Sequence, residues 1–183
     1  MLECTHNYNK SRYFDREGQD PRTWEGYDAY AQTRDAVTYI RNHGAATAEN
    51  RKPFSLFLSW GPPHAPYRTG PTKWLEHYDR KKLTLRENVP AQIRKQAQLT
   101  YAGYYAHCSA LDECVGWLMT ALRETGQLEN TIVVYTSDHG DMLHSRGQLK
   151  KQRPWDESIR VPFLLRCPSR LKARPSKIEA PIN

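Results

Sequence analysis

The sequence has few of the features that would place it in several common protein classes. Its 183 residues include four cysteines, none of them in a C-x-x-C pair, so neither a zinc ribbon nor a disulfide-stapled scaffold is indicated. No stretch approaches the roughly 18 consecutive apolar residues of a membrane span, and no charged-then-apolar leader opens the chain. We therefore expect no membrane span and, by default, a cytoplasmic location.

The positive charge is in excess but is not concentrated. The 27 Lys and Arg residues outnumber the 20 Asp and Glu residues and give a formal net charge of +7, which favours anionic partners. The strongest basic clusters, 80–82 and 150–153, are short and are typical of solvated surface. No nucleic-acid-binding motif accompanies them, so we expect a small anionic partner rather than nucleic acid.

Two stretches carry the apolar periodicity of helices. The first runs from Tyr27 to about His43, and the second from about 90 to 125, where Gly126 is a suitable stop. Cys108 and Cys114 fall in the second stretch and are expected to pack as small apolar residues.

Short apolar runs bounded by turn residues predict three buried strands, at 53–60, 131–137 and 161–167. Helices alternating with such strands indicate an α/β domain with a mainly parallel sheet flanked by helices. We expect residues 27–183 to form this core and residues 1–26 to be an irregular loop region.

Chemically capable side chains follow two of the predicted strands. In open α/β sheets, ligands bind beyond the carboxyl ends of the strands. The run 53–60 is followed by a proline-rich loop that contains His64. A loop histidine is often merely exposed, but prolines on both sides fix the backbone and hold the ring in one direction.

The run 131–137 is followed by Asp138 and His139. Asp-x-Gly is an ordinary turn sequence, yet a carboxylate at the end of a buried strand needs a hydrogen bond or a cation. A hard divalent ion would supply that partner. Adjacent strand residues point in opposite directions, so both could face one ion only if the strand ends between them, and Gly140 would allow that bend.

Taken together, these blocks resemble the sulfatase family of the alkaline-phosphatase-like superfamily over nearly the whole chain. The blocks that carry the resemblance are "ECTHNYN…WEGYDAYAQTRDA", "PFSLFLSWGPPHAPY", "LDECVGWLMTALRETGQLENTIVVYTSDHGDML" and "KKQRPWDESIRVPFLLRCP". The resemblance implies an alkaline-phosphatase-like sulfatase core and a sulfuric ester hydrolase. Its partner would be a small-molecule or carbohydrate sulfate ester, and the particular ester stays open, as does the oligomeric state.

The resemblance also implies roles for individual residues. Asp138 and His139 would contribute to a single divalent-cation site, with Ca²⁺ expected and Mg²⁺ or Mn²⁺ as alternatives. His64 would contact the sulfate or the leaving oxygen. Lys151, six residues before the glutamate of the "ES" pair, would bind the sulfate, whereas Lys150 is expected to be a surface lysine.

The chain departs from the family pattern in several places. It has neither the opening strand with paired aspartates nor the C-x-P-x-R cysteine that is oxidised to the formylglycine nucleophile. In "RCPSR" the proline directly follows Cys167, so we interpret that cysteine as structural. Arg146 stands where relatives commonly have a histidine, and His144 is the nearby imidazole that could substitute.

We therefore expect a fragment of a sulfatase catalytic domain that binds Ca²⁺ weakly when alone. Two alternatives stay open. One is a phosphodiesterase or phosphonate hydrolase of the same superfamily, since the nucleophile that would distinguish them is missing. The other is a non-catalytic remnant that keeps the fold and has lost turnover.

Overall fold

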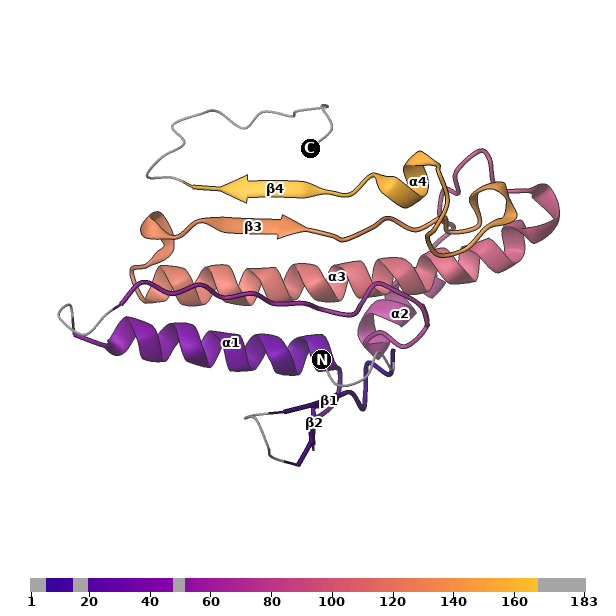
Figure 1. The fold of residues 1–183 in the computed structure, drawn as a ribbon. Helices are drawn as coiled ribbons and strands as arrows, with labels where there is room; N and C mark the ends of the chain where they lie inside the picture. The colour runs from indigo at the N-terminus through magenta and orange to yellow at the C-terminus, as the bar shows by residue number, and fades with distance from the viewer. Residues whose placement is uncertain (1–5, 15–19, 48–51, 168–183) are drawn as a thin grey trace.

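Helices dominate the part of the chain that the structure describes (Figure 1). The computed structural model describes residues 6–14, 20–47 and 52–167. Helix α3 (Arg94–Glu124) is the longest, and both α1 (Asp28–Ala45) and α2 (Thr72–Asp79) pack against it. In the part of the chain that is described, no helix is long and apolar enough to cross a membrane.

Both predicted long helices are confirmed. Helix α1 turns one face to the core, because its buried residues Ala29, Thr33, Ala36 and Ile40 recur every three or four positions. Helix α3 follows a short 3₁₀ turn at Ala91–Ile93 and ends just before Gly126. Gly126 has a φ of 68°, a left-handed conformation that glycine adopts without strain and that commonly ends helices.

The cysteines of α3 behave as small apolar residues, as predicted. Cys114 is fully buried and Cys108 is partly buried, and both are free thiols. Burial raises the pKa of the Cys108 thiol to about 12 and that of Cys114 to about 11. Neither thiol is therefore a reactive group at neutral pH.

The strands of the described residues form two small antiparallel pairs. Strand β1 (Arg12–Tyr13) pairs with β2 (Arg22–Thr23) within the region expected to be irregular. Strand β3 (Val133–Thr136) pairs with β4 (Phe163–Arg166), so both apolar runs are strands, although shorter than predicted. The short helix α4 (Asp156–Ile159) precedes β4.

The predicted parallel sheet is wrong for the described residues. Strand β4 returns beside β3 in the opposite direction, and the apolar run 53–60 is extended but belongs to no strand. In Figure 1 this run and β3 both lie along α3 and point in the same direction as each other, opposite to that of the helix. A parallel ladder forms only when strands lie side by side, and a groove separates these two segments.

Within the described ranges, the core consists of three apolar clusters, and each contains residues of α3. The first includes Tyr8, Tyr27, Leu111 and Cys114. The second includes Leu85, Val89, Ala97 and Tyr101. The third includes Ile40, Ala121, Leu122 and Leu128. Helix α3 is therefore the element on which the rest of the described chain is assembled.

Candidate active site

Two loops meet where the extended run 53–60 and strand β3 end. The rings of His64 and His139 lie edge to face with their centroids 5.9 Å apart. Both residues line one cavity together with Asp138 and Lys151. The structure thus brings all four predicted site residues together, although it does so without a parallel sheet.

His64 and Lys151 are in direct contact. The Lys151 Nζ lies 2.8 Å from the Nε2 of His64, and the His64 Nδ1 lies 2.9 Å from the carbonyl oxygen of Ala65. A carbonyl can only accept, so Nδ1 carries the proton, and an ammonium can only donate, so Nε2 accepts. Both ring nitrogens of His64 are therefore engaged while the imidazole is neutral.

Tyr8 and His6, which lie far from His64 in sequence, contact the loop that carries it. The Tyr8 side chain is 2% exposed, and its hydroxyl donates to the carbonyl oxygen of His64 at 2.8 Å. The His6 ring stacks on the His64 ring, with centroids 4.3 Å apart and an angle of 14° between the planes. Burial, followed by the charges of His64 and Lys151, lowers the pKa of His6, which favours its neutral form at pH 7.

Sequence reasoning assigned no role to these two residues. The Tyr8–His64 contact joins positions 56 apart, and residues so distant leave no local spacing pattern. The "THNY" stretch contributed only to the resemblance.

His107 gives the same loop a second support from within α3. This residue is fully buried; the Tyr27 hydroxyl donates to its Nδ1 at 2.8 Å, and its Nε2 faces the carbonyl oxygen of Pro66 at 3.4 Å. Burial lowers the pKa of His107 to about 4, and the contact with Pro66 opposes this shift only in part. His107 is therefore a neutral imidazole at neutral pH, and it packs beneath the loop that carries His64.

Asp138 and His139 can both serve as cation ligands, but two protein ligands do not complete a metal site. The His139 Nδ1 donates to the carbonyl oxygen of Gly140 at 2.7 Å, which leaves the lone pair of Nε2 facing the Asp138 Oδ2 at 3.6 Å. Two electron-rich atoms that face each other in this way would suit a shared cation. No group of three or more His, Cys, Asp or Glu residues that could hold a metal ion exists in the described ranges. The residues described here therefore do not form a complete metal site.

Gly140 is required for close packing and not for the expected bend. Its φ is not positive, and its N–H donates to the carbonyl oxygen of Ser158 at 2.8 Å. A Cβ at this position would lie 2.3 Å from the carbonyl oxygen of Glu157. The glycine of the "SDHG" block is thus needed because that block packs directly on the "ES" block.

Asp141 ties the two site loops together. It is buried, its Oδ1 accepts from the N–H groups of Leu143 and Lys150 at 2.9 and 3.1 Å, and its Oδ2 accepts from the Tyr67 hydroxyl at 2.9 Å. The Arg86 guanidinium donates to the Asp141 carbonyl oxygen at 3.2 Å. Burial first, and then the Asp141 charge, raise the pKa of Tyr67. This network fixes the backbone immediately before Lys151.

The remaining residues of interest lie away from the cavity. Lys150 is exposed, as predicted. His144 is buried and its Nε2 contacts the Thr100 hydroxyl at 2.9 Å, so its imidazole faces α3 and does not substitute in the site. Cys167 is buried, which agrees with a structural role, and Cys4 lies outside the described residues.

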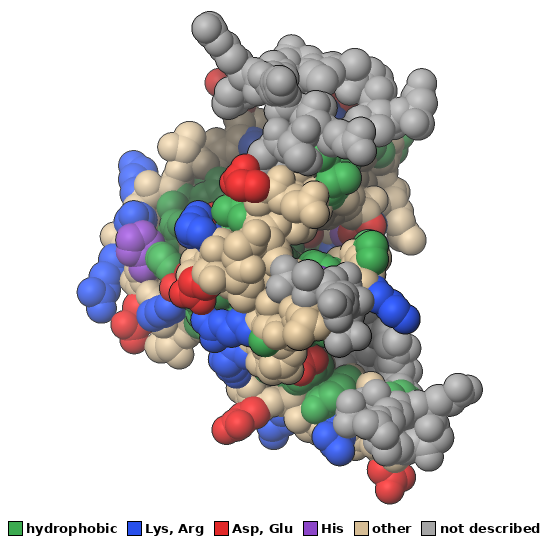
Figure 2. Space-filling view, turned by 90° about the vertical axis from the view of Figure 1, so that its left-hand side faces the viewer, with side chains coloured by type: hydrophobic (Ala, Val, Ile, Leu, Met, Phe, Trp, Pro, Cys, Tyr) green, Lys and Arg blue, Asp and Glu red, His purple; other side chains and the backbone are tan. Residues whose placement is uncertain are grey.

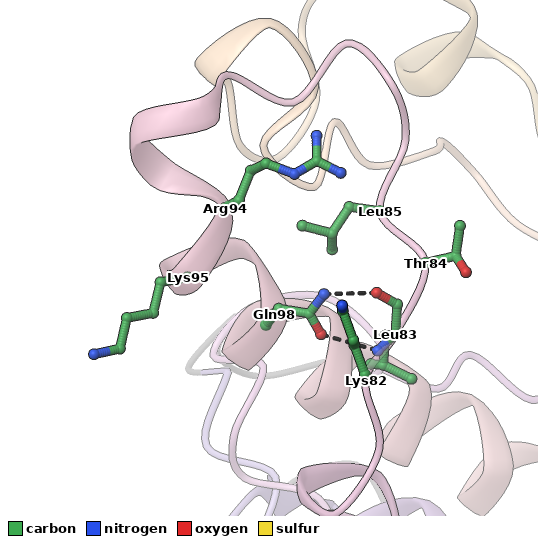
Figure 3. Close-up of a pocket in the computed structure, with 7 residues that line it drawn as sticks. All are labelled: Lys82, Leu83, Thr84, Leu85, Arg94, Lys95 and Gln98. Atoms are coloured by element: carbon green, nitrogen blue, oxygen red, sulfur yellow. Dashed lines mark hydrogen bonds between the residues drawn. The ribbon is translucent and has the colours of Figure 1, made fainter.

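A second hollow of about 460 Å³ lies between the loop at 82–85 and the start of α3 (Figure 3). Gln98 bridges this hollow, accepting from the Leu83 N–H at 3.0 Å and donating to the Leu83 carbonyl oxygen at 2.6 Å. Its lining contains no histidine, carboxylate or cysteine. The hollow therefore lacks the acid, base and ligand groups that the first cavity has.

Comparisons with known proteins agree in covering most of the chain. A family model described as Sulfatase matches residues 4–183. The ulvan-active sulfatase of Formosa agariphila is 38% identical over 184 aligned positions, which cover 100% of this chain and 35% of that protein.

Two solved structures are similar in fold. The protein yidJ of Bacteroides fragilis superposes with a TM-score of 0.84 at 26% identity, covering 92% of this chain and 37% of that one. A structure from work on glycosaminoglycan metabolism by Bacteroides thetaiotaomicron gives a TM-score of 0.80 at 26% identity, covering 92% and 35%. The chain thus spans about a third of the length of these relatives.

Proposed function

We propose, because this chain belongs to the sulfatase family, that its cavity takes part in the hydrolysis of a sulfate ester. The observation that carries the proposal is the contact of the Lys151 ammonium with the His64 imidazole, at 2.8 Å. Because a cation and a group that can transfer a proton are adjacent there, both would reach one substrate atom in this proposal. Both groups are what cleavage of an anionic ester with an alcohol leaving group requires.

In this proposal, Lys151 binds the sulfuryl group. A lysine ammonium forms short, charge-assisted hydrogen bonds to anionic oxygens. When it turns towards a sulfate oxygen it leaves the His64 Nε2, which then becomes free to take up a proton. The Nδ1 remains engaged with the carbonyl oxygen of Ala65, so Nε2 is the nitrogen that would donate to the departing alcohol.

Asp138 and His139 would hold a divalent cation, with Ca²⁺ proposed first. Such an ion would neutralise charge on the sulfate. Because the described residues supply too few ligands for a complete site, we derive no catalytic step through the ion. Further ligands and the formylglycine nucleophile would have to come from polypeptide outside the described residues. We therefore propose that the 183 residues alone bind the anion without turning it over.

A sulfated carbohydrate is the substrate class that we propose. The support comes from relatives, since one is named for its activity on ulvan and another comes from work on glycosaminoglycans. The stack of His6 on His64 agrees with this class. A neutral imidazole beside the leaving oxygen can both donate and accept hydrogen bonds, as sugar hydroxyl groups require.

The proposal is tested by two neighbouring lysine substitutions. Lys151→Ala removes the charge that faces His64, whereas Lys150→Ala removes an exposed charge one residue away. We expect the first to weaken binding of inorganic sulfate, measured by NMR titration, by about tenfold or more, because a charge-assisted hydrogen bond is lost. The second should change binding by less than about twofold. Equal effects of the two substitutions would contradict the assignment of Lys151 as the anion-binding residue.

A further inference from the structure

The hollow beside the start of α3 has basic side chains, and no acidic one, among the described residues that line it. Lys82 comes from the loop 82–85, and Arg94 and Lys95 come from the first turn of the helix. In Figure 3, Arg94 extends from α3 towards the loop, and Lys95 points outward at the edge of the hollow. The hollow has no group that could catalyse a reaction, but its charge suits an anion.

The positive charge of the hollow is not neutralised by the described residues around it. Lys82, Arg94 and Lys95 form no ion pair with a described carboxylate. The Arg94 guanidinium donates to a backbone carbonyl oxygen at 3.2 Å. Asp79, which precedes the loop, is already bound by the Arg68 guanidinium through hydrogen bonds of 2.7 and 2.8 Å. The three cations are therefore available to a ligand.

The opposite end of α3 has a different distribution of charge. There, Arg41 pairs with Glu124 at 2.9 Å, and Arg166 pairs with Glu129 at 2.7 Å. Figure 2 views this end of the molecule and shows basic and acidic side chains interspersed. Mixed charge of this kind is typical of ordinary solvated surface. Charge of one sign around a hollow is therefore a local feature of the other end.

The loop beside the hollow is fixed to α3 at two points. The Gln98 side chain accepts from the Leu83 N–H at 3.0 Å and donates to the Leu83 carbonyl oxygen at 2.6 Å. The Leu85 side chain is 6% exposed and packs on α3 in the second core cluster. Lys82 and Thr84 thus extend from a held backbone, so an anion would bind without first ordering the loop.

The same loop connects the hollow to the site cavity. Thr84 lines both, and Arg86 lines the cavity. The Arg86 guanidinium donates to the Asp141 carbonyl oxygen at 3.2 Å, and the Asp141 carboxylate accepts from the N–H of the residue before Lys151. The two residues from Thr84 back to Lys82 span at most about 7 Å. The hollow therefore lies beside the cavity, within reach of a ligand that extends out of it.

We propose, resting on the function proposed above, that the hollow is a distal subsite for a second sulfate group of the same substrate. One sulfate of a carbohydrate chain lies at Lys151, and another, on a neighbouring sugar unit, lies between Lys82 and Arg94. An ammonium and a guanidinium both form short, charge-assisted hydrogen bonds to sulfate oxygens. Two such contacts in one ligand raise its affinity, because the second contact forms at a high effective concentration. The substrate is therefore a chain with repeated sulfate groups.

Two sugar probes of different length test this inference by NMR titration of the 183-residue chain. One is a glycosaminoglycan-derived disaccharide with one sulfate group, and the other is the tetrasaccharide made of two such units. We expect the tetrasaccharide to bind about tenfold more tightly or better. Because one ligand spans both places, the Gln98 side-chain amide and the His64 ring signals should follow one common affinity for the tetrasaccharide.

Two double substitutions with the same change in net charge provide the control. Lys82→Gln/Arg94→Gln should weaken tetrasaccharide binding by about fivefold or more and change disaccharide binding, read at the His64 signals, by less than about twofold. Arg34→Gln/Arg123→Gln removes two exposed charges that line neither the hollow nor the cavity. It should change the binding of both probes by less than about twofold, because separated surface charges are screened. Lys82→Gln alone, which removes no hydrogen bond of the described residues, should weaken tetrasaccharide binding selectively if the double variant does not fold.

Three results would overturn the inference. The first is an equal loss of tetrasaccharide binding in the two double variants, which would indicate general attraction by net charge. The second is unchanged tetrasaccharide binding in the hollow variants. The third is displacement of the tetrasaccharide by a short DNA duplex at a lower concentration than its own, which would make nucleic acid the partner.

Failure of the proposed function would have a different signature. In that case Lys151→Ala would leave the binding of inorganic sulfate, read at the His64 signals, unchanged. If only the distal subsite is wrong, Lys151→Ala still weakens sulfate binding while Lys82→Gln/Arg94→Gln leaves tetrasaccharide binding as in the wild type.

Discussion

The run 53–60 and the loop 61–70 are consecutive in sequence, but the protein holds them in opposite ways. The run, here called the open segment, makes no backbone hydrogen bond to any described residue. The loop, here called the closed loop, receives the Tyr8 hydroxyl on the His64 carbonyl oxygen and packs its Tyr67 backbone directly on Gly103 of α3. The position of His64 is therefore set by side chains and by one helix, without support from a sheet.

The strongest test of this difference is a methyl group placed between α3 and the closed loop. A Cβ at Gly103 would lie 2.2 Å from the Tyr67 carbonyl oxygen, so Gly103→Ala should push the loop away from the helix. We expect it to lower the free energy of unfolding by about 3 kcal/mol or more, as overpacking against backbone does. Urea denaturation measures this loss.

Gly116→Ala is the matched control on the same helix. A Cβ at Gly116 would meet nothing within 4 Å, so this change should raise the free energy of unfolding by up to about 1 kcal/mol through helix propensity alone. If both substitutions stabilised the protein, the closed loop could not be held by contact with α3.

The second test is the dependence of stability on pH, which we expect to reflect the protonation of His107. Its pKa is about 4 in the folded protein and about 6.5 when unfolded. The unfolded state therefore binds more protons between these values, and stability falls as the pH drops from 7 towards 4. The free energy of unfolding should decrease by about 2 kcal/mol between pH 7 and pH 5 from this residue alone.

His107→Asn isolates that contribution. The amide of asparagine does not titrate, so the variant should be less stable than the wild type at pH 7 and should lose about 2 kcal/mol less on acidification. The difference between the two unfolding curves is the relevant measurement. A wild type and variant with the same pH dependence would show that His107 does not remain neutral beneath the loop.

A smaller effect is expected from the hydroxyl of Tyr8. Tyr8→Phe removes the donor to the His64 carbonyl oxygen and should cost about 1 to 2 kcal/mol, because a partly buried acceptor loses its partner. It should also shift the His64 ring signals in NMR spectra. Tyr39→Phe, at a side chain that is 46% exposed, should change neither quantity, and a matching shift there would argue against a specific role for Tyr8.

The smallest effect should come from the open segment. Phe57 is 89% exposed, so Phe57→Ser should change the free energy of unfolding by less than about 0.5 kcal/mol. The same substitution should reduce self-association at high concentration, which light scattering would detect, because exposed apolar surface is removed. A loss of stability comparable to that of Tyr8→Phe would erase the contrast between the two regions.

Local patterns predicted the elements well and their pairing poorly. The helical periods of 27–43 and 90–125 reappear as α1 and α3, because each follows from the side chains of one continuous segment. The predicted parallel sheet is not seen in the described residues, since pairing depends on which segments lie side by side. No local signal showed that β4 returns antiparallel to β3 or that 53–60 has no partner in the described residues.

The candidate site followed the same division. Asp138 and His139 could be predicted because they follow an apolar run, His64 because it lies in the proline-rich loop after another, and Lys151 because of a resemblance in spacing. The residues that hold them could not be predicted. Tyr8 reaches the His64 loop across 56 positions, and Tyr27 reaches His107 across 80. Such contacts are set by the folded chain, and no period or turn sequence encodes them.

The length of helix α3 determines how the closed loop and the groove lie relative to each other. Its 31 residues extend over about 46 Å at 1.5 Å per residue. One half carries Gly103 and His107 against the closed loop, and the other carries Leu118 and Leu122 beneath the groove. Loss of a single residue between the halves would rotate one relative to the other by about 100°. The number of residues between 107 and 118 therefore fixes the orientation of the closed loop relative to the groove.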